Sequence, residues 1–203
     1  MLEDIEKYLP KYLSPPEQAK LFEELAQFPE NIHNRLYTSK LDGDPVIFQG
    51  DGLSALPFIE LPSTDVYYAK VIVISNTCDI AQNHSRFVPA RIMYCPLIRL
   101  QGYRESLIQA YPDQVERIDS HVESVRRQEC SSMFYLPAGM RLQEERIALL
   151  DRIVHHRMDQ LDTAELLRGR LFTLSDYGFY LFLYKISIHF TRLREAVVRG
   201  YSD

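Results

Sequence analysis

The residues best suited to covalent chemistry follow a strongly apolar segment. Residues 71–74 (VIVI) form a β-branched run, which is typical of a strand buried on both faces, and Cys78 and Asp79 come shortly after it. A cysteine thiolate at the end of a rigid strand is a candidate nucleophile, and His84 is the nearest histidine that can serve as its base. The alternative is that Cys78 is a small buried apolar side chain and Asp79 caps a turn.

Carboxylates and histidines suggest a second kind of site. Asp51, Asp79 and Asp151 could meet at one rim of a barrel and bind a divalent cation, because hard cations prefer carboxylate oxygens. The alternative is that each aspartate faces solvent or pairs with an arginine. His155 and His156 resemble half of a metal site, but no further ligand stands nearby at a suitable spacing. We therefore predict no bound metal and no other cofactor.

A third candidate site is a polar stripe on the last predicted helix. Its cationic members recur at intervals of four, three and seven residues, and they are Lys185, His189, Arg192 and Arg199. The other positions are rich in Tyr, Phe, Leu and Ile, so the stripe could bind a phosphodiester backbone while tyrosine rings stack on bases. The alternative is that the stripe is the face that an amphipathic helix turns towards water.

The elements that would position these residues follow from the periodicity of the sequence. Predicted strands are rich in Val, Ile, Phe and Tyr and cover residues 46–48, 55–61, 66–75, 87–99, 132–136 and 146–154. Predicted helices cover residues 15–28, where Ser14 and Glu17 form a capping box, then 104–128 with a kink at Pro112, a short segment from Asp162, and 177–198. We expect 66–75 and 87–99 to pair as an antiparallel hairpin.

These elements predict an α+β fold in a single domain that spans residues 1–203. A small, mostly antiparallel, SH3-like barrel covers 46–154 and contains the inserted helix 104–128. A helical extension, 1–45, precedes the barrel, and a helical segment, 155–203, follows it.

Composition limits the possible functions. The net charge of −5 gives no global attraction to nucleic acid, so binding would need a local basic patch. The three cysteines, an odd number, are Cys78, Cys95 and Cys130, and none of them forms a CxxC motif. This pattern predicts reduced thiols in the cytoplasm. The N-terminus has no signal-peptide pattern, and the most apolar stretch contains charged residues, so we predict neither export nor a membrane span.

Several short motifs resemble the MazF/PemK family of bacterial toxins. They are Gly50-Asp51, VIVISN at 71–76, Asn83, and Cys95-Pro96-Leu97. The resemblance implies an SH3-like barrel, cleavage of single-stranded RNA by a homodimer, and an antitoxin that binds over the RNA groove. This sequence has Ala69-Lys70 where the family has Arg-Pro, and Leu97-Ile98 where it has Thr or Ser. The sequence also contains TCDI at 77–80, FYLP at 134–137 and LSDYGFYLFLYK at 174–185. With these motifs it resembles the members of a separate uncharacterised bacterial family that is built on the same kind of barrel.

Three functions from different classes follow as hypotheses. The first is a toxin or defence protein that engages RNA, with ribonuclease activity left open. The second is a non-catalytic protein-interaction module that uses the aromatic last helix as part of its interface. The third is a hydrolase that uses Cys78. The expected partners are single-stranded RNA, a protein such as an antitoxin, or a second copy of the chain, and no membrane.

Overall fold

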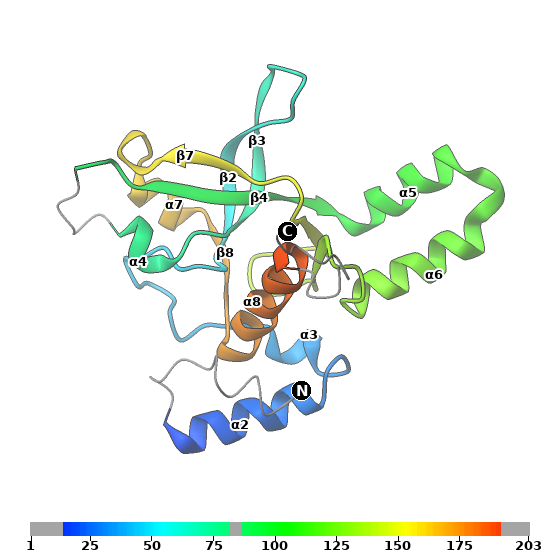
Figure 1. Ribbon diagram of the computed structural model, residues 1–203, viewed down its shortest axis with the longest axis horizontal. Coiled ribbons are helices and arrows are strands. Elements are labelled where there is room, and N and C mark those ends of the chain that lie inside the picture. The colour runs from blue at the N-terminus through cyan, green and yellow to red at the C-terminus, as the bar shows by residue number, and fades with distance from the viewer. Residues whose placement is uncertain (1–13, 82–86, 192–203) are drawn as a thin grey trace, which may run out of the picture.

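The computed structural model describes residues 14–81 and 87–191, and it is an α+β structure built on one antiparallel sheet (Figure 1). The α-helices are α2 (Pro15–Ala26), α3 (Ile32–Arg35), α4 (Thr77–Ile80), α5 (Leu100–Ala110), α6 (Val115–Arg126), α7 (Thr163–Arg168) and α8 (Asp176–Thr191). The strands are β1 (Tyr37–Thr38), β2 (Gly52–Ile59), β3 (Val66–Val73), β4 (Arg91–Arg99), β5 (Met133–Leu136), β6 (Arg146–Leu149), β7 (Val154–Arg157) and β8 (Arg170–Leu174).

The sheet is open within the described residues. Its strand order is β1-β8-β2-β3-β4-β6-β5, and β7 pairs with β4. Strand β4 pairs with β3 along one edge, and along the other edge it pairs with β7 and then with β6. The terminal strands β1 and β5 do not pair with each other. The predicted antiparallel sheet and the predicted pairing of 66–75 with 87–99 are confirmed, whereas the predicted closed, SH3-like barrel is not.

Two hydrophobic cores cover the two faces of this sheet. Alternate residues of a strand point to opposite faces, and in β3 Ile72 joins one core while Val71 and Val73 join the other. The larger core contains Phe182 of α8, and the smaller contains Leu166 of α7. The prediction that the VIVI run is buried on both faces is therefore correct.

The predicted helix 104–128 is two antiparallel helices. Helix α5 ends at Ala110, a single 3₁₀ turn (Pro112–Gln114) follows, and the chain reverses into α6. Proline has no amide hydrogen to donate, so it is tolerated in the first turn of the new helix and interrupts the old one. The Arg104 guanidinium and the Asp119 carboxylate join the helices at 2.6 Å, and Figure 1 shows this α5–α6 hairpin projecting from the body.

Residues 46–48, predicted as a strand, are part of a loop instead. The buried guanidinium of Arg170 in β8 donates hydrogen bonds to the carbonyl oxygens of Leu41, Asp44 and Val46. These carbonyls are therefore satisfied by a side chain, without a neighbouring strand. Arg170 also lies over the Phe48 ring, 5.6 Å from its centroid.

The last helix is the most apolar of the described helices. Helix α8 starts at Asp176 and is described to Thr191, so the predicted end at 198 lies outside the described residues. Figure 1 shows α8 lying across the sheet. Among the described helices, none has both the length and the hydropathy needed to cross a bilayer.

Candidate functional site

The TCDI segment forms the single helical turn α4. The Asn76 side chain accepts a hydrogen bond from the Cys78 amide at 2.9 Å, which is the N-cap contact that starts such a turn. Ile80 is buried, whereas Cys78 and Asp79 are exposed. The expectation of a buried Cys78 is therefore wrong. His84 lies outside the described residues, so the dyad of Cys78 and His84 stays a prediction.

The three aspartates of the hypothetical metal site occupy different environments. Asp79 and Asp151 are exposed, whereas Asp51 is fully buried. Across the described residues, no three His, Cys, Asp or Glu side chains come together in a way that could hold a metal ion. The possibility that these aspartates converge is therefore excluded, and the expectation of an outward-facing Asp151 is correct.

Asp51 instead fixes the loop before β2 to strand β8. Its carboxylate accepts hydrogen bonds from the Thr173 hydroxyl at 2.7 Å and from the Phe48 amide at 2.9 Å, and it lies 3.2 Å from Arg170 Nε. Burial raises the pKa of Asp51 to about 6, although these three contacts act in the opposite direction. A buried carboxylate held on every side in this way has a structural role.

The cationic stripe of α8 is interrupted by burial. Lys185 is only 4% exposed, and its ammonium donates a hydrogen bond to the Gln128 carbonyl oxygen. Burial lowers the pKa of Lys185 to about 8. His189 is half-buried, and Arg192 and Arg199 lie outside the described residues. A phosphate contact by Lys185 does not fit this geometry, because the side chain points into the protein.

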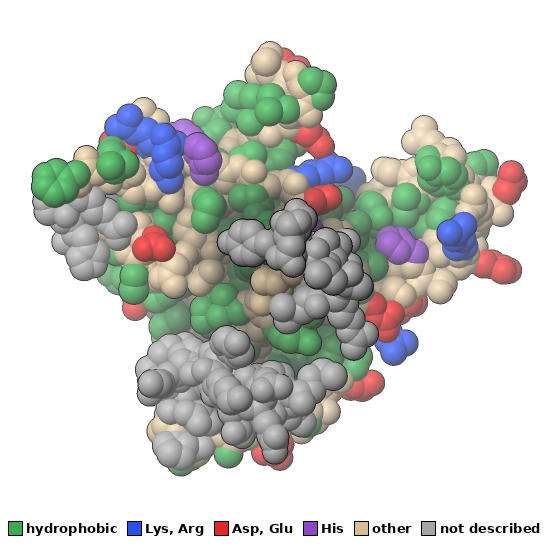
Figure 2. All heavy atoms as spheres, viewed as in Figure 1, with side chains coloured by type: hydrophobic (Ala, Val, Ile, Leu, Met, Phe, Trp, Pro, Cys, Tyr) green, Lys and Arg blue, Asp and Glu red, His purple; other side chains and the backbone are tan. Residues whose placement is uncertain are grey.

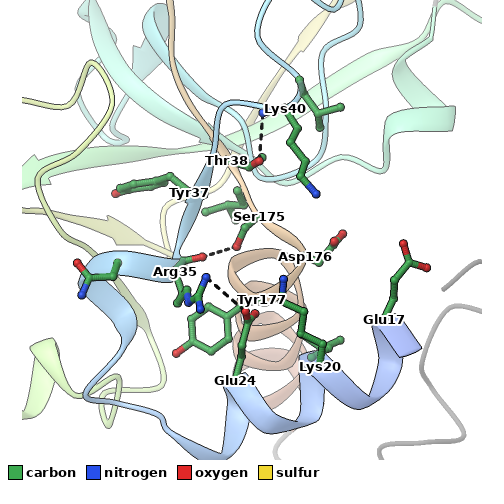
Figure 3. Close-up of a pocket in the computed structure, with 14 residues that line it drawn as sticks. Glu17, Lys20, Glu24, Arg35, Tyr37, Thr38, Lys40, Ser175, Asp176 and Tyr177 are labelled. Atoms are coloured by element: carbon green, nitrogen blue, oxygen red, sulfur yellow. Dashed lines mark hydrogen bonds and ion pairs between the residues drawn. The ribbon is translucent and has the colours of Figure 1, made fainter. Parts of the chain in front are cut away.

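A cavity of about 440 Å³ lies between α2, the segment around β1 and the start of α8 (Figure 3). Lys20 and Lys40 extend towards each other from opposite walls, and acidic side chains lie beside them. Glu24 pairs with Arg35 at 3.6 Å, and the Ser175 hydroxyl donates to the Arg35 carbonyl oxygen. The lining therefore carries charges of both signs and contains no pairing of a nucleophile with a base.

The hairpin of β2 and β3 carries a group of exposed apolar side chains. We define the β2–β3 tip as residues 58–68, and Figure 1 shows it projecting from the body. Leu61 and Tyr68 are 76% and 75% exposed, and Val66 and Tyr67 are also exposed. Figure 2 shows hydrophobic side chains gathered over this hairpin. Four exposed apolar side chains therefore share this one hairpin, whereas Phe87 and Val88, which are also strongly exposed, lie shortly before β4.

A basic patch lies where β4 pairs with β7. The register places Arg91 opposite Arg157 and Met93 opposite His155, so all four side chains share one face. Arg91 Nη1 lies 3.0 Å from His155 Nδ1, while Arg157 pairs with Asp159 at 2.6 Å. Figure 2 shows basic and histidine side chains together in this region. We call these four residues the β4–β7 patch.

A cysteine and a histidine do come together elsewhere in the fold. The Tyr103 hydroxyl lies 3.0 Å from His121 Nε2, and His121 Nδ1 lies 3.9 Å from Cys130 Sγ. These residues come from α5, from α6 and from the segment after α6. The sequence does not reveal this cluster, because only the reversal of the chain between the two helices brings Tyr103 to His121.

Comparisons with known proteins add no relative, since no protein-family model and no curated protein matches this chain. The resemblance to MazF/PemK toxins therefore stays a prediction.

Proposed function

We propose that this protein is a protein-interaction module and that the β2–β3 tip is its docking element. The observation that carries the proposal is the cluster of exposed Leu61, Val66, Tyr67 and Tyr68 on one projecting hairpin. Single apolar residues on a surface are ordinary, but a contiguous exposed group marks an interaction site. Tyrosine suits such a site because it buries a large area and keeps a polar end.

The backbone of the tip is also available to a partner. Strand β2 pairs with β8 only at Gly52 and Leu53, and β3 pairs with β4 only at residues 71–73. Among the described residues, both outer edges of the tip therefore present unpaired amides and carbonyls. An open strand edge with apolar side chains is a template for pairing with another chain.

The hairpin is held in one position, which lowers the entropic cost of binding. The Tyr94 hydroxyl donates a hydrogen bond to the Pro57 carbonyl oxygen at the base of the tip. Arg152, between β6 and β7, pairs with Glu60 at 2.5 Å. Rings of Phe58 and Tyr67 lie 5.4 Å apart across the two strands. These contacts order the element before the partner arrives.

The charge of the tip indicates the chemistry of the partner. Asp65 is acidic, Glu60 already pairs with Arg152, and residues 58–68 contain no Lys or Arg. The best complement is a protein with an apolar groove or strand edge bordered by basic side chains.

A paired substitution tests this function. The variant that combines Leu61→Ser with Tyr68→Ser removes most of the exposed apolar area of the tip, and Tyr111→Ser removes an exposed tyrosine from the α5–α6 hairpin as a control. Tagged proteins are purified from crosslinked source cells, and bound proteins are quantified. We expect the tip variant to lose a partner that the wild type and the control both retain. Equal retention by all three proteins would contradict the proposal.

The second candidate function is binding of single-stranded RNA, which the MazF/PemK resemblance implies and the β4–β7 patch favours. Arg91 and Arg157 can each contact a phosphate, and each contact contributes about −0.7 to the salt dependence of binding. We expect Arg91→Glu with Arg157→Glu to weaken RNA binding at least about tenfold and to flatten its salt dependence. The control is Arg117→Glu on α6. Wild-type protein that binds no RNA at low salt would rule out this candidate.

A further inference from the structure

The cluster of Tyr103, His121 and Cys130 is separate from the β2–β3 tip and resembles the arrangement of an assisted nucleophile. Cys130 Sγ, at 3.9 Å from His121 Nδ1, is within reach of an S–H···N hydrogen bond. The other ring nitrogen of His121 is 3.0 Å from the Tyr103 hydroxyl. A nucleophile beside a base, with a third group that orients the base, is the pattern of covalent catalysis.

The surroundings of Cys130 decide which chemistry fits. The thiol is half-buried, so a small reagent can reach it. Burial raises the pKa of Cys130, and the Lys185 ammonium opposes this effect. The thiol is therefore protonated at neutral pH. Reactions that require a preformed thiolate do not suit this site, whereas attack assisted by a base, in which the proton leaves as the new bond forms, does.

We propose that Cys130 is a nucleophile for acyl transfer, that His121 is its general base, and that Tyr103 is a positioning residue. The substrate class is an activated ester or thioester. As Sγ bonds to the carbonyl carbon, its proton passes to His121 Nδ1. The bond from that carbon to the leaving oxygen or sulfur then breaks, and His121 returns the proton to the leaving group. The product is a thioester on Cys130.

This mechanism requires one tautomer of His121. Nδ1 must be unprotonated to accept the thiol proton, so Nε2 carries hydrogen and donates to the Tyr103 oxygen. That hydrogen bond orients the ring and stabilises the imidazolium that forms during the attack. The neighbouring Lys185 ammonium favours negative charge on the sulfur as its proton leaves.

The two other cysteines are internal references. Cys95 is completely buried, and burial raises its pKa strongly, so we expect no acylation there in the folded protein. Cys78 is exposed on α4, in a different part of the structure. In a His84→Gln background, which removes the candidate base of Cys78, it reports the rate of an accessible thiol in the same sample.

The experiment follows acetylation by 4-nitrophenyl acetate at pH 7.5, with peptide mass spectrometry to read each cysteine. In the His84→Gln protein, we expect Cys130 to be acetylated at least about tenfold faster than Cys78, with release of one equivalent of nitrophenolate per acetylated thiol. His121→Gln should slow acetylation of Cys130 about 100-fold, the lower end for general-base assistance, and leave Cys78 unchanged. Tyr103→Phe should slow the acetylation of Cys130 several-fold and shift the midpoint of the pH–rate profile of that reaction.

Two results would overturn the proposal. One is acetylation of Cys130 in the folded His84→Gln protein no faster than that of Cys78. The other is a rate at Cys130 that His121→Gln leaves unchanged. Should His121→Gln fail to fold, the ratio of the acetylation rates of Cys130 and Cys78 in the His84→Gln protein decides alone. That ratio should fall to near one in urea.

Discussion

Two hairpins project from the body of this protein (Figure 1), and both expose apolar side chains, but they differ in how their polar groups are paired. In the α5–α6 hairpin, Arg104 pairs with Asp119 and Tyr103 contacts His121, so its polar groups bond across the two helices. In the β2–β3 tip, Leu61 and Tyr68 face water and the strand edges are unpaired. Projection alone therefore does not indicate a docking element, whereas unpaired backbone beside an exposed apolar cluster does.

The largest effect should come from the body that carries both hairpins. Phe182 is fully buried in α8, with its ring 5.1 Å from that of Phe134, so Phe182→Ala should cost about 3–5 kcal/mol in the free energy of unfolding. Phe190→Ala on the same helix is the control, because Phe190 is exposed, and it should cost less than about 0.5 kcal/mol. Urea unfolding measures both. A loss below about 1 kcal/mol for Phe182→Ala would mean that the Phe182 side chain is not buried in the core.

The root of the β2–β3 hairpin should respond to pH. Asp51 directly precedes β2, and burial raises its folded-state pKa to about 6, above its ordinary value of 3.8. Because the folded-state pKa is the higher one, protonation of Asp51 stabilises the folded protein. This stabilisation is fully present below about pH 4 and is lost as pH rises through about 6. The loss is on the order of 3 kcal/mol. Asp51→Asn should remove it, as measured by urea unfolding at pH 4, 5, 6 and 7. An unchanged pH dependence in that variant would contradict the assignment.

The α5–α6 hairpin should depend weakly on its ion pair. Arg104 and Asp119 are both partly exposed, so Arg104→Ala should lower the free energy of unfolding only slightly, and less at high salt. Hydrogen exchange of the α5 and α6 amides should quicken locally. A destabilisation as large as that of Phe182→Ala would show that the hairpin is far more dependent on this contact than its exposure implies.

The smallest effect should be at the tip. Tyr68→Ser removes a side chain that is 75% exposed, so the free energy of unfolding should change by less than about 0.5 kcal/mol. Tyr111→Ser should behave in the same way. If Tyr68→Ser destabilised the protein strongly while Tyr111→Ser did not, the tip would be part of the fold, and its apolar surface would need no partner.

Local patterns predicted much of this fold from the sequence. The VIVI run is buried on both faces because unbroken β-branched segments suit the interior of a sheet covered on both sides. Asp162 was a recognisable N-cap, and its carboxylate accepts from the amides of Ala164 and Glu165.

Features that depend on distant residues were not predictable in this way. Strand β8 has no counterpart among the predicted strands, although its buried run stands between Gly169 and Ser175, two residues typical of turns. Helical spacing places Lys185 on a polar stripe, which predicts that its side chain faces solvent or a ligand. Its partner is a carbonyl oxygen of Gln128, on a different element, and α8 is apolar on most of its circumference, which is typical of a buried helix.

The docking function of the β2–β3 tip is tested most directly by crosslinking in source cells. A photo-crosslinking phenylalanine analogue replaces Tyr68 in one protein and Tyr111 in another, so that each projecting hairpin carries the same probe. We expect irradiation to produce a discrete protein adduct from position 68 and none from position 111. Adducts from both positions in equal yield, or from neither, would contradict the assignment of the tip as the docking element.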